Sequence, residues 1–158
     1  MTSATISFPI RLDRRARPLL LAFGVSPGSA WLRLEPDRVV ARFGFSQAEI
    51  PLADVERWDV TGPYRWWRAI GIRGTPGEPE ITYGGSTRGG LCLHLRAPVR
   101  IAWINVRRFY VTVDDLEGLG AALAARGIHG DDRRRSGSRG ISTPAPDQDR
   151  PGSVLDAE

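Results

Sequence analysis

Aromatic rings and guanidinium groups are concentrated in one short segment between two strand-like stretches. Its side chains are Tyr64, Arg65, Trp66, Trp67 and Arg68. Such a surface suits phosphates, carboxylates or a protein partner, because guanidinium groups pair with anions and large rings act as anchors. The Gly62-Pro63 dipeptide ends the preceding strand, and the two adjacent tryptophans point in opposite directions. We expect one ring to anchor the segment, with Arg73 and Arg88 extending this candidate binding surface.

Cys92 and His94 form a second pattern with possible chemistry. They lie two apart in a strand-like stretch and therefore share a face, which is compatible with metal binding. The other histidine, His129, follows the predicted C-terminal helix, so a set of three soft ligands cannot be assembled from these residues. The sequence therefore predicts no metal and no cofactor, and Cys92 is expected to pack as a small apolar side chain.

Two further patterns could carry chemistry, and each has a simpler interpretation. The segment 84–90 is glycine-rich like a phosphate-binding loop, but no helix follows it and it contains no lysine, so we predict a flexible hairpin. Carboxylates also cluster along a turn and a strand, where alternation predicts a solvated face: Glu49, Asp54, Glu56 and Asp59. Since no acid–base pair with supporting groups is visible, we predict that the protein is not an enzyme.

Composition indicates one globular domain followed by a tail. The chain has 158 residues of which 41% are hydrophobic, enough for a single sizeable core. All 22 basic residues are arginine, and the formal net charge of +4 comes mainly from the middle third of the chain. The single cysteine excludes an intramolecular disulfide and points to a cytoplasmic location. Acidic residues interleave with the arginines of 133–139, so a nucleic-acid partner is not expected.

The N-terminal region leaves one alternative open. Arginines between 11 and 17 precede the apolar run 18–25, and small residues follow at 28–30, which imitates a cleaved export signal. The alternative is therefore an exported or cell-envelope protein. Against it, the apolar run is short and the residues before it already have the pattern of a strand. No run approaches the ~20 apolar residues of a membrane-spanning helix.

The elements that must position these residues are mostly strands, because apolar residues recur with a period of two. The predicted strands are 6–12, 30–34, 38–43, 48–51, 55–61, 70–73, 80–83, 91–96, 100–104 and 109–113. Many short strands at this spacing predict a barrel or sandwich with antiparallel connections. The pattern changes near Asp114, where Leu116, Leu119 and Leu123 take helical spacing up to Gly127. Residues 128–158 offer little apolar material and are predicted to be disordered.

Two stretches resemble a known fold. Residues 49–60 resemble a strand and turn of bacterial pleckstrin-homology-like (PH-like) and GRAM-like domains, and 111–123 resemble the start of their final helix. More narrowly, 60–71 and 88–99 resemble a family of uncharacterised actinobacterial proteins. The resemblance implies a mainly β, partly open antiparallel barrel or sandwich capped by one C-terminal helix, with a PH-like domain at 6–127.

The resemblance says little about function, because this fold serves lipid binding, peptide binding and scaffolding alike. We expect a non-catalytic intracellular binding or scaffolding domain that docks through the Arg/Trp-rich segment 64–68. An acidic protein partner is favoured over an anionic membrane surface at the inner membrane face, because single scattered arginines lack the density expected of strong lipid recognition.

Overall fold

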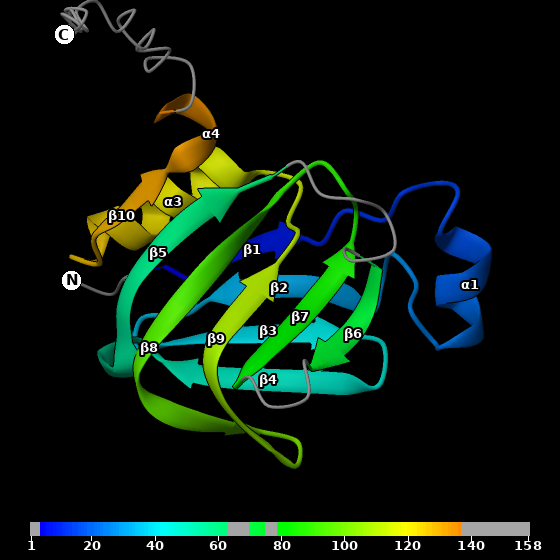
Figure 1. Ribbon diagram of the computed structural model, residues 1–158, viewed down its shortest axis with the longest axis horizontal. Coiled ribbons are helices and arrows are strands. Elements are labelled where there is room, and N and C mark those ends of the chain that lie inside the picture. Colours follow the sequence, from blue (N-terminus) through cyan, green and yellow to red (C-terminus); the bar gives the residue numbers. More distant parts are fainter. Residues whose placement is uncertain (1–3, 63–69, 75–78, 137–158) are drawn as a thin grey trace, which may run out of the picture.

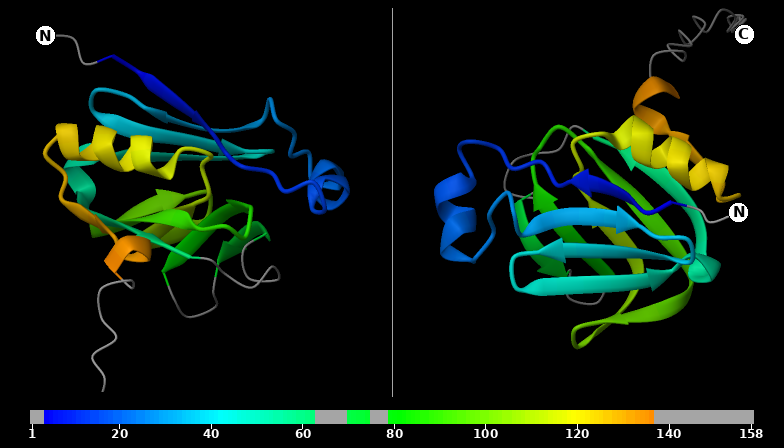
Figure 2. Two further views of the ribbon diagram at one scale, coloured as in Figure 1. Left: turned by 90° about the horizontal axis from the view of Figure 1, so that it is seen from above. Right: turned by 180° about the vertical axis from the view of Figure 1, so that it is seen from behind.

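Two β-sheets lie face to face around one hydrophobic core in the computed structural model (Figure 1; Figure 2, left). The structure describes residues 4–62, 70–74 and 79–136. The candidate segment 64–68 lies outside the described residues. Over the described residues the two sheets do not close into a barrel, and the mainly β character agrees with the prediction.

The first sheet is an antiparallel meander with the order β1-β2-β3-β4. Its strands are β1 (Ile6–Pro9), β2 (Ala30–Leu34), β3 (Arg38–Phe43) and β4 (Ser46–Pro51). Alternation explains its inner face, since Leu32 and Leu34 are fully buried while Arg33 between them is exposed. A short helix, α1 (Arg17–Ala22), lies between β1 and β2 in the chain.

The second sheet follows a 3-10 turn, η1 (Leu52–Asp54), and has the order β10-β5-β8-β9-β7-β6. Its strands are β5 (Val55–Thr61), β6 (Ile70–Gly74), β7 (Glu80–Gly85), β8 (Gly90–Ile101), β9 (Ile104–Val111) and β10 (Gly130–Asp132). Two pairs, β5 with β10 and β7 with β9, are parallel, which the antiparallel prediction did not anticipate. Because β9 lies between β7 and β8, the segment 86–89 is a crossover and not the predicted hairpin.

The β8–β9 hairpin corrects the predicted strand boundaries. One long strand replaces the two predicted at 91–96 and 100–104, and the chain turns at Ala102 and Trp103. The register between β8 and β9 shifts between His94 and Val99. Pro98 falls within this irregularity, where a residue without an N–H is tolerated. A proline inside a strand pattern therefore marked a bulge and not a strand end.

The C-terminal helix α3 (Leu116–Ala125) forms where the sequence predicts it and lies at one side of the two sheets (Figure 2). Asp115 caps it, its Oδ1 accepting a hydrogen bond from the Gly118 N–H at 2.7 Å. Leu116, Leu119 and Leu123 are all buried. The helix therefore contributes a leucine stripe to the core.

The chain stays ordered beyond the predicted start of the tail at residue 128. Ile128 is buried, β10 pairs with residues 58–60 of β5, and a short helix α4 (Arg133–Ser136) follows. The indole N–H of Trp58 donates to the Ile128 carbonyl at 3.0 Å, which ties this segment to β5. The first part of the predicted tail thus belongs to the domain, and 137–158 lie outside the described residues.

Candidate functional site

The structure places one predicted binding residue on a described surface. Arg88 is exposed in the β7–β8 crossover, whereas Arg73 is on β6 and its side chain lies outside the description. The crossover is fastened to the segment before α1, because the Asp13 carboxylate accepts from the Ser86 hydroxyl at 3.1 Å and the Thr87 N–H at 3.2 Å. The residue after Arg88, Gly89, lies against Thr61 of β5 and near Arg134 of α4, so Arg88 stands between these two attachments.

The end of the molecule that carries α1 exposes large apolar side chains together with arginines. Helix α1 lies beyond the strands at an extreme of the molecule (Figures 1 and 2). Leu19 and Leu21 on the helix and Phe23 directly after it are 57 to 65% accessible, and Phe45 in the β3–β4 turn is 90% accessible. We call the following side chains the α1 patch: Arg14, Arg15, Arg17, Leu19, Leu21, Phe23 and Phe45.

Local sequence explains why the α1 patch forms. Leu20 and Val25 are buried and anchor the helix, so the neighbouring apolar residues must face outward. Gly24 has a positive φ of 72°, and a Cβ there would lie 2.3 Å from the Phe45 ring. Only glycine both adopts this backbone geometry readily and leaves room for the ring. Phe45 is therefore held against the residue that follows Phe23.

The α1 patch has an excess of positive charge. The guanidinium groups of Arg14, Arg15 and Arg17 have no hydrogen-bond or ion-pair partner among the described residues. The nearest acidic side chain in sequence, Asp13, is already engaged by the crossover through its hydrogen bonds to Ser86 and Thr87. The three guanidinium groups are therefore available to an anionic partner. The α1 patch is thus both apolar and cationic.

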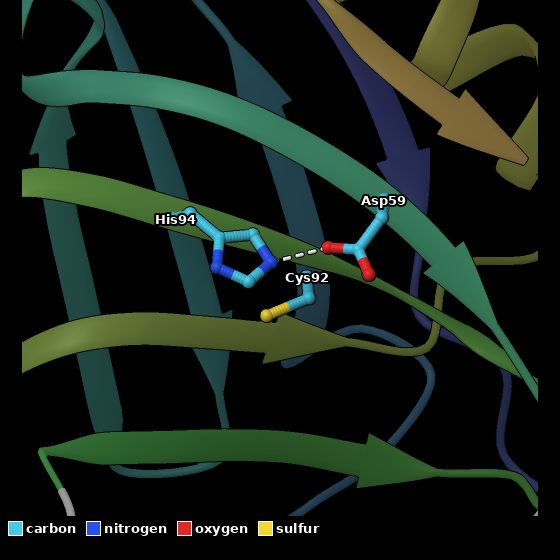
Figure 3. Close-up of side chains that lie close together, drawn as sticks. All are labelled: Asp59, Cys92 and His94. Atoms are coloured by element: carbon cyan, nitrogen blue, oxygen red, sulfur yellow. Dashed lines mark hydrogen bonds and ion pairs between the residues drawn. The ribbon is translucent and has the colours of Figure 1, made fainter. Parts of the chain in front are cut away.

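A second candidate lies on the outer face of the second sheet, where Asp59, Cys92 and His94 meet (Figure 3). Asp59 on β5 is directly opposite Cys92 on β8, and His94 follows two residues along the same strand. One ligand atom from each residue lies within 4.8 Å of the others. Carboxylate oxygen, thiol sulfur and imidazole nitrogen are ligands typical of zinc sites.

Hydrogen bonds fix the state of this cluster. His94 Nε2 is bonded to Asp59 Oδ1, and Arg57 Nη2 lies 3.3 Å from His94 Nδ1. A guanidinium group can only donate, so Nδ1 accepts and Nε2 carries the proton that is donated to Asp59. Arg57 and Arg133 also form ion pairs with Asp59, at 3.7 and 3.5 Å. The buried Asp59 carboxylate is therefore contacted by three donor groups, those of His94, Arg57 and Arg133.

Cys92 is unreactive in this state. Burial, followed by the negative charge of Asp59, raises the pKa of its thiol to about 12. The thiol is therefore protonated at neutral pH, and the thiolate required of a nucleophile is absent. Cys92 is buried as predicted, but beside Asp59 and His94 on the outer face of the sheet and not in the apolar core under the C-terminal helix.

The raised pKa predicts a loss of stability at alkaline pH. Because the pKa of the Cys92 thiol is higher in the folded chain than the ordinary value of 9.0, its contribution is complete below about pH 9 and is lost as pH rises toward about 12. A three-unit difference corresponds to at most about 4 kcal/mol. Denaturant titrations of wild type and Cys92→Ala between these pH values should show a shallower decline for the variant. Burial also raises the pKa of Tyr83, so the stability of both proteins should decline to some extent. Equal slopes for wild type and Cys92→Ala would contradict the raised pKa of the Cys92 thiol.

The cluster corrects two interpretations of the sequence. Asp59 was placed on a solvated face with Glu49, Asp54 and Glu56, but it is only 6% exposed. It also supplies the third potential ligand that the sequence argument could not find. The pairing of β5 with β8 brings the groups together across 35 residues of sequence, and no local pattern specifies that pairing.

Other charged groups near the first sheet compensate one another. A hollow between β4, η1 and β8 is lined by Asp37, Arg38, Glu49, Ile50, Pro51, Asp54, Pro98 and Val99. Arg38 forms ion pairs with Glu35, Asp37 and Glu49, which compensates part of the charge, and the lining as a whole keeps two more carboxylates than arginines. The hollow is therefore a weaker candidate for a ligand-binding site than the α1 patch or the Asp59 cluster.

Within the described residues, no helix has the length and apolar character needed to cross a membrane. Comparisons with protein-family models, curated proteins and solved structures found no match for the chain. The function is therefore inferred from the α1 patch and the Asp59 cluster.

Proposed function

We propose that this protein is a non-catalytic, PH-like binding domain that docks peripherally on an anionic membrane surface through the α1 patch. The observation that carries the proposal is the joint exposure of Leu19, Leu21, Phe23 and Phe45 beside three arginines whose guanidinium groups have no partner among the described residues. Large apolar side chains exposed beside charged ones at one end of a fold indicate a candidate interaction site. Two sheets followed by the amphipathic helix α3 support the PH-like part of the proposal.

The side chains of the α1 patch suit the boundary between headgroups and acyl chains. Apolar groups gain about 25 cal/mol for each Å² removed from water, and each arginine near an anionic leaflet adds about 1 kcal/mol. Neither contribution alone gives firm attachment, since stable anchoring needs two signals. The patch provides both, which predicts reversible binding that depends on lipid charge.

A membrane accounts for the shape of the site better than the acidic protein partner favoured by the sequence. A standard protein interface buries about 800 Å² on each partner, whereas the α1 patch is centred on a helix of six residues at one extreme of the molecule. Arginines that are scattered along a sequence can still gather in the folded chain. In the fold, Arg14, Arg15 and Arg17 lie in and just before α1, within one turn of the chain.

The non-catalytic part of the proposal rests on the Asp59 cluster. Cys92 is protonated at neutral pH, and both nitrogens of His94 are occupied by hydrogen bonds. These groups therefore lack the free base and the activated nucleophile that acyl or group transfer requires. We place the protein in the cytoplasm at the inner membrane face, because its described cysteine is a free thiol and because the cytoplasmic leaflet carries the anionic lipids that the α1 patch would bind.

Vesicle flotation tests this function. We expect the full chain to float with vesicles containing phosphatidylserine, to float less with phosphatidylcholine alone, and to dissociate from the anionic vesicles as salt is raised. The double variant Phe23→Ser/Phe45→Ser should weaken binding to anionic vesicles at least about tenfold, because two exposed rings lose their apolar contact.

Trp103→Ser is the matched control, since this ring is 84% exposed but lies in the β8–β9 turn outside the α1 patch. It should bind vesicles like wild type. If the same amount of wild-type protein reached the floating fraction with anionic vesicles, with neutral vesicles and without vesicles, the membrane function would be excluded. A protein partner would then be the remaining candidate. Equal loss in the Trp103 variant would show nonspecific adsorption of exposed rings.

A further inference from the structure

We propose that Asp59, Cys92 and His94 form a binding site for one thiophilic divalent metal ion of the zinc class. The site is independent of the α1 patch, because its three residues lie on the outer face of β5 and β8 (Figure 3). It adds a ligand to the proposed membrane-binding domain and does not depend on membrane binding.

The donor set determines which ions can be bound. One oxygen, one nitrogen and one sulfur ligand suit zinc or cobalt, whereas magnesium and calcium require nearly all-oxygen sites. Bonds to zinc of about 2.0 to 2.3 Å allow one ion to touch atoms that lie within 4.8 Å of one another after small side-chain rotations. The fourth tetrahedral position is left for water.

The scaffold holds these ligands in place. Asp59 and Cys92 are opposite each other on adjacent interior strands of the sheet, and both are buried. The side chain of His94 is 19% exposed and therefore connects the cluster to solvent. An ion can enter beside His94 and meet ligands whose backbone positions are already fixed, so little ordering entropy opposes binding.

Two arginines oppose metal binding: Arg133 pairs with Asp59 at 3.5 Å, and Arg57 competes with the ion at two of its ligands. The Arg57 guanidinium donates to His94 Nδ1 and pairs with Asp59, as a competing cation does. Arg57 is a 45% exposed side chain at 3.7 Å from the carboxylate, an arrangement that contributes little energy and can be given up. On coordination, the thiol proton passes to solvent, the histidine proton moves from Nε2 to Nδ1 by exchange with water, and Arg57 withdraws.

Cobalt titration of the chelator-treated full chain tests the site. We expect one cobalt ion per chain, a thiolate-to-cobalt charge-transfer band, and loss of that band when zinc is added. Asp59→Asn, Cys92→Ser and His94→Gln should each weaken binding at least about tenfold, since each removes a ligand. Arg57→Gln should tighten binding several-fold, because it removes a competing cation.

His129→Gln is the control, because this exposed histidine lies outside the cluster and should leave binding unchanged. Circular dichroism identifies variants that fail to fold, and the partly exposed His94 provides a variant least expected to do so. The proposal is overturned if neither wild type nor Arg57→Gln shows a thiolate band, or if folded His94→Gln binds cobalt as wild type does. Since membrane binding uses other residues, vesicle flotation separates its failure from that of the metal site.

Discussion

Replacing Arg14, Arg15 and Arg17 together with glutamine is expected to reduce binding to phosphatidylserine vesicles about 100-fold. The three guanidinium groups have no partner among the described residues, so each can interact with anionic headgroups. At about 1 kcal/mol for each arginine, the triple change removes about 3 kcal/mol, which corresponds to roughly two orders of magnitude in the partition constant. The measurement is vesicle flotation over a range of lipid concentrations at low salt.

The same variant separates the charge contribution from the apolar one. It should bind neutral vesicles like wild type and lose the dependence on salt, whereas Phe23→Ser/Phe45→Ser should retain that dependence. Arg100→Gln/Arg107→Gln is a suitable control, because both arginines are exposed on β8 and β9 away from the α1 patch. If this control lost as much binding as the triple variant, net charge and not the α1 patch would explain the attraction.

Most strands could be predicted from the sequence because apolar alternation is a local property. The order of the strands could not, since β9 separates β7 from β8 and β10 joins the edge of β5 from the far end of the chain. The boundary of the domain was placed too early for a related reason. Residues 128–132 have little apolar content, and it is the edge of β5, together with the Trp58 indole, that orders them.

Neither candidate site could be assembled in full from the sequence, because each depends on contacts between distant segments: Cys92 and His94 were visible as a pair, and Asp59 was not. In the α1 patch, Phe45 lies against Gly24, and neither the β3–β4 turn nor the helix indicates this alone. The apolar run 18–25 was visible in the sequence, where it resembled an export signal. In the structure Leu20 and Val25 are buried in the core while their neighbours face outward. The candidate Arg/Trp segment 64–68 lies outside the described residues, so its role stays a prediction.

The two candidate sites require different states of the arginines around them. The guanidinium groups of Arg14, Arg15 and Arg17 have no partner among the described residues and can bind anions directly. Arg57 and Arg133 pair with a buried carboxylate, and a metal ion must displace at least Arg57. Cationic residues therefore support binding at the α1 patch and restrain it at the Asp59 cluster, which is why their removal is expected to have opposite effects.

Tyr83→Ala should lower the free energy of unfolding by about 3 to 5 kcal/mol, the range for truncating a large buried aromatic side chain. Tyr83 is fully buried on β7, with its ring stacked on Phe43 of the first sheet at 5.8 Å and edge-on to Phe109 of the second at 5.1 Å. It therefore connects the two sheets through the core. A loss of this size is a large part of the 5 to 15 kcal/mol typical of a domain, and denaturant titration measures it directly.

Two comparison variants determine what Tyr83 and the α1 patch each contribute. Tyr83→Phe keeps the ring and loses only the hydrogen bond to the Ser46 hydroxyl, so it should cost about 1 kcal/mol. Phe45→Ser removes a ring that is 90% exposed and should change stability by no more than about 0.5 kcal/mol. If Phe45→Ser instead lowered the free energy of unfolding as much as Tyr83→Ala does, the Phe45 ring would be part of the core, and the α1 patch would not be a docking surface. A stable variant that no longer binds vesicles is the result that assigns Phe45 to function and Tyr83 to the fold.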